Sequence, residues 1–244
     1  MVFLIEAKDM MFVLSRIFGI RRGNFSFLAS RTFFTKELRS TRRIGPHDKI
    51  ILDIIFGSML GDAHAELRSG ATRIALHQGN KNVAYLKHLV KILCDRGYCS
   101  PKKLKLTRQI GKGGEIYFSL KKNTYSFQSF NWIHAKWYPC GIKIVPRDIG
   151  HYLSARGLAL WIMDDGSRTK DGVVLSTNSF TCREVLVLRA ALRRNFGLKT
   201  TCRERGNGYI IYILAECVPK LQAIVDPYMI RSMRYKIEPY NLIK

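Results

Sequence analysis

The segment "LALWIMDDGS", residues 158–167, runs from apolar side chains directly into two adjacent carboxylates and a glycine. A similar arrangement occurs earlier in the chain, where "FGSMLGDAH", residues 56–64, follows its apolar run with Asp62. A carboxylate at a helix C-terminus faces the negative end of the helix dipole, which costs roughly 0.3–1 kcal/mol when the group is exposed. Its occurrence twice in one chain indicates that these acids do something other than stabilise their helices.

Metal binding is one role that fits carboxylates in this position. Mg²⁺ takes oxygen ligands and commonly needs one or two carboxylates, with phosphate oxygens and water completing its coordination. The alternative is that each aspartate begins a turn with the small residue after it. The duplication favours metal binding, and so does the pair Gly57 and Gly61, which lie four apart and let a second helix approach closely. If the two helices pack side by side, both acids emerge at the same end.

The charge balance indicates a polyanionic partner. The 244 residues include 41 Lys and Arg against 18 Asp and Glu, which gives a formal net charge of +23. The basic residues are spread through segments that read as strands and helices, which favours nucleic acid over a membrane surface. No apolar run approaches the ~20 residues that span a bilayer. The six cysteines include no C-x-x-C pair and indicate reduced thiols rather than a disulfide framework.

Hydrophobic periodicity predicts the same kinds of element in each half, with one motif at the end of the first helix of each half. In the first half it predicts a helix, a hairpin, a helix, two strands and a helix, over residues 46–63, 64–78, 82–97, 104–121 and 126–138. In the second it predicts a helix, a strand, a helix, a hairpin and a helix, over residues 153–165, 172–180, 183–197, 199–214 and 217–230. Pro46 suits the first turn of the first helix, and Thr181 with Glu184 has capping-box spacing.

The chain therefore divides into three parts. Residues 1–45 are expected to be a poorly ordered leader, because residues 10–35 combine four arginines with Ser, Thr and apolar residues and contain no acid. This composition is typical of an organelle transit peptide, and the alternative is a remnant of an upstream reading frame. Residues 46–146 and 147–244 are expected to form two similar α/β units.

The two motifs and the sequence segments around them resemble the LAGLIDADG homing endonucleases in their single-chain, two-motif form. Three further segments support the resemblance: "NKNVAYLKHL" at 80–89, "VVLSTNSFTCREVLVLRAALRRNFGL" at 173–198 and "DPYMIRSMRYKI" at 226–237. The resemblance covers about residues 50–238. It implies an α+β fold of two pseudo-symmetric units, each a curved antiparallel sheet backed by helices, which together form a DNA-binding saddle. Ala63 departs from the glycine usual at that position, and Leu160 and Trp161 are bulkier than usual at the helix interface.

The resemblance also implies roles for individual residues. Asp62 and Asp165 would bind the metal, while Lys143 in "KIVP" and Lys236 in "RYKI" would stabilise developing negative charge or poise a water molecule. For each lysine, the alternative is a general phosphate contact. Strands that enter the major groove read base edges and phosphates, which makes candidates of Arg73, His77, Arg108, Gln109, Ser176, Arg203 and Arg205. For each of these a solvated surface position is the alternative, and His77 and Ser176 are also candidates for organising water at the scissile phosphates.

The function expected from these observations is site-specific, double-strand DNA cleavage in intron homing. The enzyme would be a monomer that hydrolyses phosphodiester bonds with Mg²⁺, Mn²⁺ being a substitute, and its partner would be a double-stranded DNA target site with no membrane involved. The alternative is an RNA maturase that binds its host intron for splicing. A non-catalytic binder such as a ribosomal protein explains the charge but leaves the duplicated acids unexplained. The expected location is the mitochondrion, with the chloroplast as the alternative.

Overall fold

The computed structural model describes residues 39–111 and 113–238, apart from the side chain of Gln109. Most of the expected leader, residues 1–38, lies outside the described residues. Described structure begins before residue 46, with the 3-10 turn η1 (Ser40–Arg42). The next residue, Arg43, is buried, and its guanidinium donates to the carbonyl of Ser126 over 2.8 Å. Contacts with the first α/β unit therefore include part of the segment expected to be leader.

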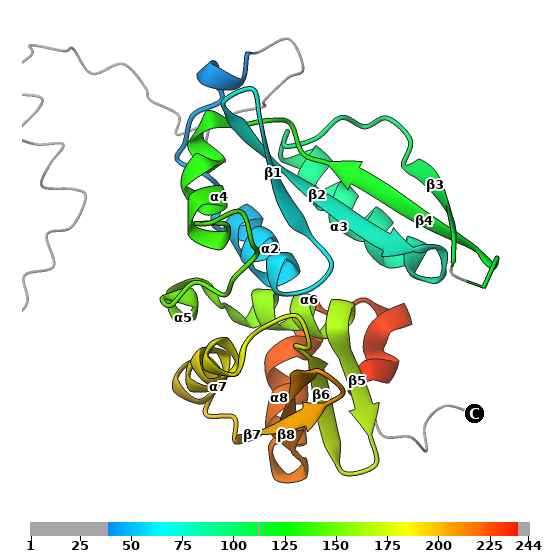
Figure 1. Ribbon diagram of the computed structural model, residues 1–244, viewed down its shortest axis with the longest axis vertical. Helices are drawn as coiled ribbons and strands as arrows, with labels where there is room; N and C mark the ends of the chain where they lie inside the picture. The colour runs from blue at the N-terminus through cyan, green and yellow to red at the C-terminus, as the bar shows by residue number, and fades with distance from the viewer. Residues whose placement is uncertain (1–38, 112, 239–244) are drawn as a thin grey trace, which may run out of the picture. The chain divides into compact units, whose positions relative to one another are not determined.

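The first α/β unit contains a four-stranded antiparallel sheet in the order β1-β2-β4-β3. Helices pack against one face of the sheet, as Figure 1 shows. The strands are β1 (His64–Arg68), β2 (Ala71–Gly79), β3 (Lys105–Ile110) and β4 (Ile116–Asn123). The helices are α2 (Lys49–Leu60), α3 (Val83–Asp95) and α4 (Asn131–Trp137), with the 3-10 turns η2 (Asn80–Asn82) and η3 (Gln128–Phe130).

The second α/β unit repeats this topology with the strand order β5-β6-β8-β7. Its strands are β5 (Gly166–Thr169), β6 (Gly172–Ser176), β7 (Thr200–Arg205) and β8 (Gly208–Leu214). Its helices are α5 (Ile149–Tyr152), α6 (Ala155–Asp165), α7 (Cys182–Phe196) and α8 (Val218–Val225), followed by the 3-10 turns η5 (Asp226–Tyr228) and η6 (Arg231–Lys236), with η4 (Ala215–Cys217) before α8. The expected fold of two pseudo-symmetric α/β units with antiparallel sheets is confirmed.

Local capping signals explain where the main helices begin and end. The Thr181 and Glu184 side chains form the expected capping box at the start of α7, and Gly197 ends that helix with a φ of 61°. The prediction that Pro46 lies in the first turn of α2 was wrong. The side chain of Asp48 accepts a hydrogen bond from the Ile50 amide and starts the helix at Lys49, three residues after the proline.

Strand β5 was not predicted from the sequence. Its four residues are polar or small, so they lack the apolar alternation by which a strand is recognised. It forms because the chain leaves α6 beside β6, where Ser167 pairs with Val174 and Arg168 with Val173. The short helix α5 was missed for a related reason, since four residues are too few to show a helical period.

Helices α2 and α6 pack directly against each other and link the two α/β units. A side chain at Gly57 would clash with the backbone of Gly157, and one at Gly61 would clash with the side chain of Asp164. The close approach expected from Gly57 and Gly61 is therefore present. Apolar residues around the contact, such as Phe56 and Trp161, are fully buried.

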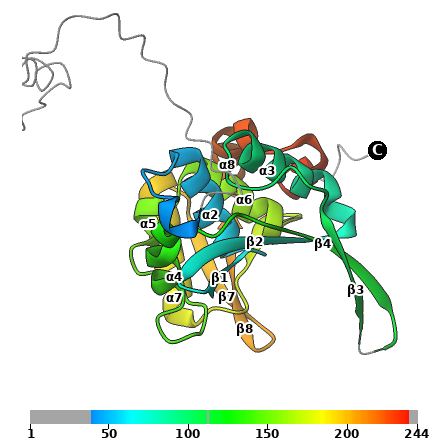
Figure 2. The ribbon, with the colours of Figure 1, turned by 90° about the horizontal axis from the view of Figure 1, so that it is seen from above.

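Each sheet has a helix-covered face and an open face. On the first sheet, Ile74, Leu76 and Leu120 point toward the helices and belong to the main hydrophobic core. Because side chains alternate along a strand, the residues between them lie on the opposite, open face. Figure 2 shows β3 and part of β4 extending beyond the helices, so apolar residues there, including Leu106 and Phe118, stay exposed. Within the described residues, no helix has both the length and the apolar character needed to cross a bilayer.

Candidate functional site

Three carboxylates meet where α2 and α6 end. Asp62 lies in the turn after α2, while Asp164 and Asp165 are the last two residues of α6. The amide nitrogen of Gln78, at the end of β2, donates to Asp62 Oδ2 over 2.8 Å and to Asp164 Oδ1 over 2.7 Å. The amide oxygen of Gln78 accepts from Asn82 Nδ2 over 3.0 Å. The nitrogen of the Gln78 amide is therefore the atom that faces the acids. The ends of the two motif helices are thus joined by one side chain.

Two lysines stand at the same helix ends, one for each motif. Lys143 Nζ donates to the carbonyls of Gly61 and Ala63 over 3.2 and 2.9 Å. Lys236 Nζ donates to the carbonyls of Met163 and Asp164 over 2.6 and 2.8 Å. Cations at a helix C-terminus offset the negative end of its dipole and satisfy carbonyls that have no partner within the helix. The two lysines therefore occupy pseudo-symmetric positions, each at the backbone carbonyls of one motif helix end, next to the carboxylates.

Burial shifts the pKa of most of these groups toward the neutral form. Burial, together with the negative charge of Asp62, raises the pKa of Asp165 to about 6, although Lys236 and Lys143 act in the opposite direction. Burial and the charges of Asp62 and Asp165 raise the pKa of Asp164 well above its usual range. Burial also lowers the pKa of Lys236, and lowers that of Lys143 to about 8 against the attraction of the three acids. Such opposed shifts in one cluster are typical of functional sites.

The donor set is suited to a divalent cation. Within the described residues, none of the three carboxylates forms an ion pair with Lys, Arg or His at 4.0 Å or less, because the ammonium groups of Lys143 and Lys236 donate to backbone carbonyls. The described residues also contain no group of three His, Cys, Asp or Glu side chains arranged to hold a metal alone. Oxygen ligands from a bound phosphate and from water would have to complete the coordination, which is usual for Mg²⁺.

The open face of the first sheet carries a cluster of charged side chains around Glu66. Register places His64, Glu66, Arg73, His77 and Lys121 on this face. Arg73 and Lys121 both donate to the Glu66 carboxylate. His77 bonds through Nε2 to the hydroxyl of Ser119 over 2.7 Å. Arg73 and His77, two of the expected nucleic-acid-binding residues, therefore share one surface.

Arg108 does not share that surface. It pairs with Phe118 and alternates with Thr107 and Gln109, so its side chain belongs to the opposite face of β3, with the exposed Leu106. Gln109 pairs with Tyr117 in the register, and its side chain lies outside the described atoms.

The open face of the second sheet is more apolar. Val174, Ile210 and Tyr212 form a small cluster there, separate from the main core. The guanidinium of Arg203 lies over the ring of Tyr212, 3.9 Å from its centre. Ser176 pairs with Ile210, and Arg205 pairs with Gly208 at the exposed hairpin end. Ser176, Arg203 and Arg205 therefore lie on one face, as strand alternation requires.

Sequence reasoning missed two residues that the structure places prominently. Gln78 comes sixteen positions after Asp62, and no motif marks it, but strand alternation puts it on the helix-covered face. A buried amide there requires polar partners, which is a signal that could have found it. Glu66 could have been found as the acid in the middle of the basic first hairpin.

Paired motif helices, two four-stranded antiparallel sheets and acids at both helix ends define the class of LAGLIDADG proteins. The LAGLIDADG DNA endonuclease family model matches residues 52–221, and the chain belongs to this family. The chain is 38% identical to the cytochrome b mRNA maturase bI2 of Saccharomyces cerevisiae over 84% of its own length and 51% of that protein, so it spans about half of this relative.

Two further similarities concern endonucleases. The chain is 40% identical to the intron-encoded endonuclease ai4 of Dictyostelium discoideum over 47% of its own length and 74% of that protein. Among solved structures, it is similar to the homing endonuclease I-WcaI bound to its DNA recognition sequence, with a TM-score of 0.74 and 24% identity. That match covers 97% of this chain and 99% of I-WcaI, and at this identity it supports the fold.

Proposed function

We propose that the protein is a site-specific DNA endonuclease of intron homing, which hydrolyses one phosphodiester bond in each strand of its target. The observation that carries the proposal is the meeting of Asp62, Asp164 and Asp165 at the ends of paired helices, with Lys143 and Lys236 beside them. Membership of the LAGLIDADG DNA endonuclease family supports the same activity.

Asp62 and Asp165 are the proposed metal ligands, one from each motif, and Mg²⁺ is the proposed ion, with Mn²⁺ as a substitute. When bound, the metal supplies a more acidic water and charge stabilisation at the leaving oxygen. The close spacing of the three acids supports this assignment, since a cation would offset the repulsion between their charges.

The remaining residues of the site would position these acids and balance charge. Gln78 holds the carboxylates of Asp62 and Asp164 through its amide protons, and Asn82 holds Gln78. Lys143 and Lys236 are anchored to the helix ends, where their positive charge would stabilise the anionic transition state of the phosphate. Gln78, Lys143 and Lys236 contact the carboxylates or the ends of α2 and α6, and Asn82 contacts Gln78, so the site is held by the ends of helices and strands.

The open faces of the two sheets are the proposed DNA-binding surface. Two-stranded and larger sheets enter the major groove, where Arg and Lys donate to guanine and apolar groups contact thymine methyls. Arg73 and His77 would contact DNA from the first sheet, and Ser176, Arg203 and Arg205 from the second, and His77 and Ser176 would also organise water. The position of Arg108 on the other face of its strand argues against a contact through the same surface. For Gln109, the register alone favours a contact.

One chain supplies both motifs, which supports a monomer built from α/β units at 46–146 and 147–244. We also propose a mitochondrial location, with the chloroplast as the alternative. The support is the basic, acid-free composition of residues 10–35 and the similarity to a maturase named for cytochrome b mRNA.

A second candidate function is RNA maturation, in which the protein would bind its host intron RNA and assist splicing. The 38% identity to the yeast bI2 maturase favours it. Maturation alone would not require the carboxylates, whereas cleavage would.

The proposal is tested with DNA that spans the uninterrupted exon junction of the host gene. Purified protein should cut both strands of this duplex in the presence of Mg²⁺ and leave it intact in EDTA. A scrambled duplex of equal length and composition serves as the control. No cleavage of the junction, combined with specific binding to the unspliced intron RNA, would replace the endonuclease by the maturase.

A further inference from the structure

Glu66 is surrounded by cations from three adjacent strands. Its Oε2 accepts from Arg73 Nε over 2.8 Å and Nη2 over 2.6 Å, and it lies 3.1 Å from Arg68 Nε. Its Oε1 accepts from Lys121 Nζ over 2.9 Å and contacts His64 Nε2 at 3.0 Å. One carboxylate on β1 thus fixes side chains of β1, β2 and β4.

The cluster is partly shielded from water. The side chain of Glu66 is 14% exposed, and those of Arg73 and Lys121 are 26% and 29% exposed. Burial works to raise the pKa of Glu66, but hydrogen bonds from Lys121, Arg73 and His64 outweigh it and lower the pKa to about 2. Glu66 is therefore ionised, and its hydrogen bonds are charge-assisted, which makes them short and directional.

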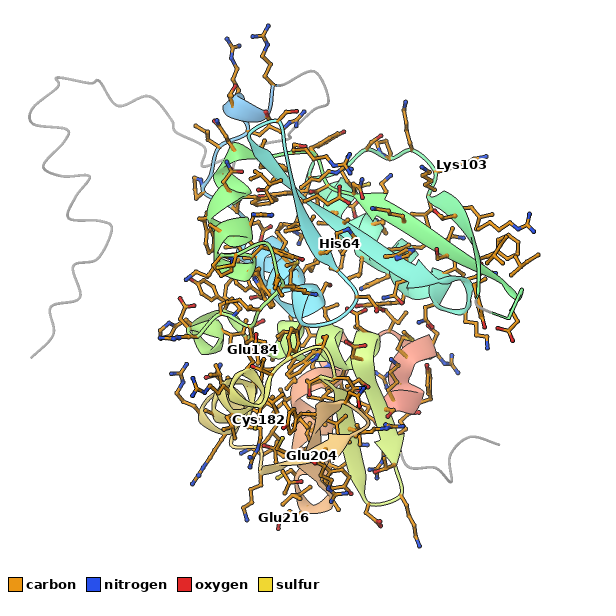
Figure 3. All side chains as sticks on the ribbon, viewed as in Figure 1. His64, Lys103, Cys182, Glu184, Glu204 and Glu216 are labelled. Carbon is orange, nitrogen blue, oxygen red and sulfur yellow. The ribbon has the colours of Figure 1, made fainter. Side chains whose placement is uncertain are left out.

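The surroundings of the cluster are strongly basic. An adjoining cavity of about 580 Å³ is lined by basic residues together with Ser100, Asn123 and Tyr125, and its described lining contains no acid. The basic residues are Arg68, Arg73, Lys102, Lys103, Lys105, Lys121 and Lys122. Figure 3 shows His64 on β1 and Lys103 near the start of β3. Glu66 is thus an acid placed within a cationic surface, and it faces away from the main hydrophobic core.

Such an acid changes whether the neighbouring cations bind DNA phosphates or base edges. An unrestrained Lys or Arg pairs with any phosphate, which adds affinity without sequence information. Arg73 and Lys121 must instead break their ion pairs with Glu66, or share their charge with it, before they can pair with a phosphate. The two bonds from Arg73 use two of the five N–H donors of a guanidinium, so its fork can still donate to a base edge. Held in this way, Arg73 suits direct readout better than general attraction.

We infer that Glu66 is a specificity-determining residue, which acts as an internal counter-ion that holds Arg73 and Lys121 and weakens binding to DNA of unrelated sequence. This role rests on the proposed DNA-binding function of the open face. Glu66 is a positioning residue, because it acts through the cations that it holds.

The test is Glu66→Gln, which keeps the shape of the side chain and removes its charge. Binding is measured by titration on the exon-junction duplex and on a scrambled duplex of equal length, at several salt concentrations. Freed cations should raise the affinity for the scrambled duplex by roughly 3- to 10-fold and steepen its log-affinity against log-salt slope by about one. Affinity for the junction should rise less or fall, so the ratio of the two affinities drops.

Glu216→Gln is the matched control. It makes the same charge change and removes an exposed ion pair of the second α/β unit, in which Glu216 Oε1 lies 3.0 Å from Lys199 Nζ. It should leave the ratio of affinities unchanged. A second check repeats Glu66→Gln in an Arg73→Gln, Lys121→Gln background, where the inference predicts no further loss of discrimination.

An equal effect of Glu66→Gln on both duplexes, or an unchanged ratio, would overturn the inference. So would failure of Glu66→Gln to fold, since the residue would then be needed for stability. Failure of the DNA-binding proposal is distinguishable from failure of the Glu66 inference, because the wild-type protein itself would then bind the junction and the scrambled duplex equally.

Discussion

Asp165 lies where its own charge is unfavourable. It ends α6, faces the negative end of the helix dipole and lies close enough to Asp62 for their charges to interact. Burial and Asp62 raise its pKa from 3.8 to about 6, so at neutral pH its ionised form costs folding free energy in the absence of a metal. A residue kept at such a cost is expected to serve function rather than stability.

We predict that Asp165→Asn stabilises the metal-free protein at neutral pH. The wild type loses stability as pH rises from about 4 through about 6, because the folded state holds its proton more tightly than the unfolded state does. The variant has no such loss, and it should be more stable by roughly 1–2 kcal/mol above pH 7. Thermal melting in EDTA from pH 4.5 to 8 measures this. A lower melting temperature of the variant at pH 7.5 would contradict it.

The duplicated motifs indicated the acids of the candidate site, and the resemblance to the LAGLIDADG family indicated its two lysines. They did not indicate Gln78 or Glu66. The role of each of these depends on which strands pair and in which register, and a one-residue shift would turn either side chain to the other face. Arg108 shows the same limit, since the composition of its strand does not determine on which face of the sheet its side chain lies.

At the scale of elements, helices with strong local signals were predictable. The apolar period of α2, α3 and α6 and the capping box of α7 locate these helices from the sequence. Strand β5 was not predictable, because its position follows from tertiary pairing with β6 rather than from its own residues.

The contact between α2 and α6 depends on glycine. We predict that Gly57→Ala destabilises the protein by roughly 1–3 kcal/mol, because the added methyl would meet the Gly157 backbone, which cannot move without displacing α6. Chemical denaturation measures the change. Gly79→Ala is the control, since nothing lies within 4 Å of its added carbon, and it should change stability by less than about 0.5 kcal/mol. Equal stability of the two variants would show that the helices are not closely packed at Gly57.

At the scale of the whole molecule, the formal net charge of +23 should dominate DNA affinity. We predict that affinity for the junction duplex falls roughly 10³- to 10⁵-fold between 50 and 200 mM salt, as expected when about 6–10 phosphate contacts release counterions. Fluorescence anisotropy at a series of KCl concentrations gives the slope. A slope near zero would mean that the basic residues of the two sheets do not contact the backbone.

The most direct test of the central claim separates cleavage from binding in Asp62→Asn and Asp165→Asn. If each acid serves a metal centre at the helix ends, either variant should lose double-strand cleavage of the junction in Mg²⁺ while its affinity for the duplex stays within about threefold of wild type, less than 1 kcal/mol. Asp95→Asn, which removes an exposed partner of Lys91 on α3, should cleave normally. Normal cleavage of both strands by Asp62→Asn or Asp165→Asn would contradict the account.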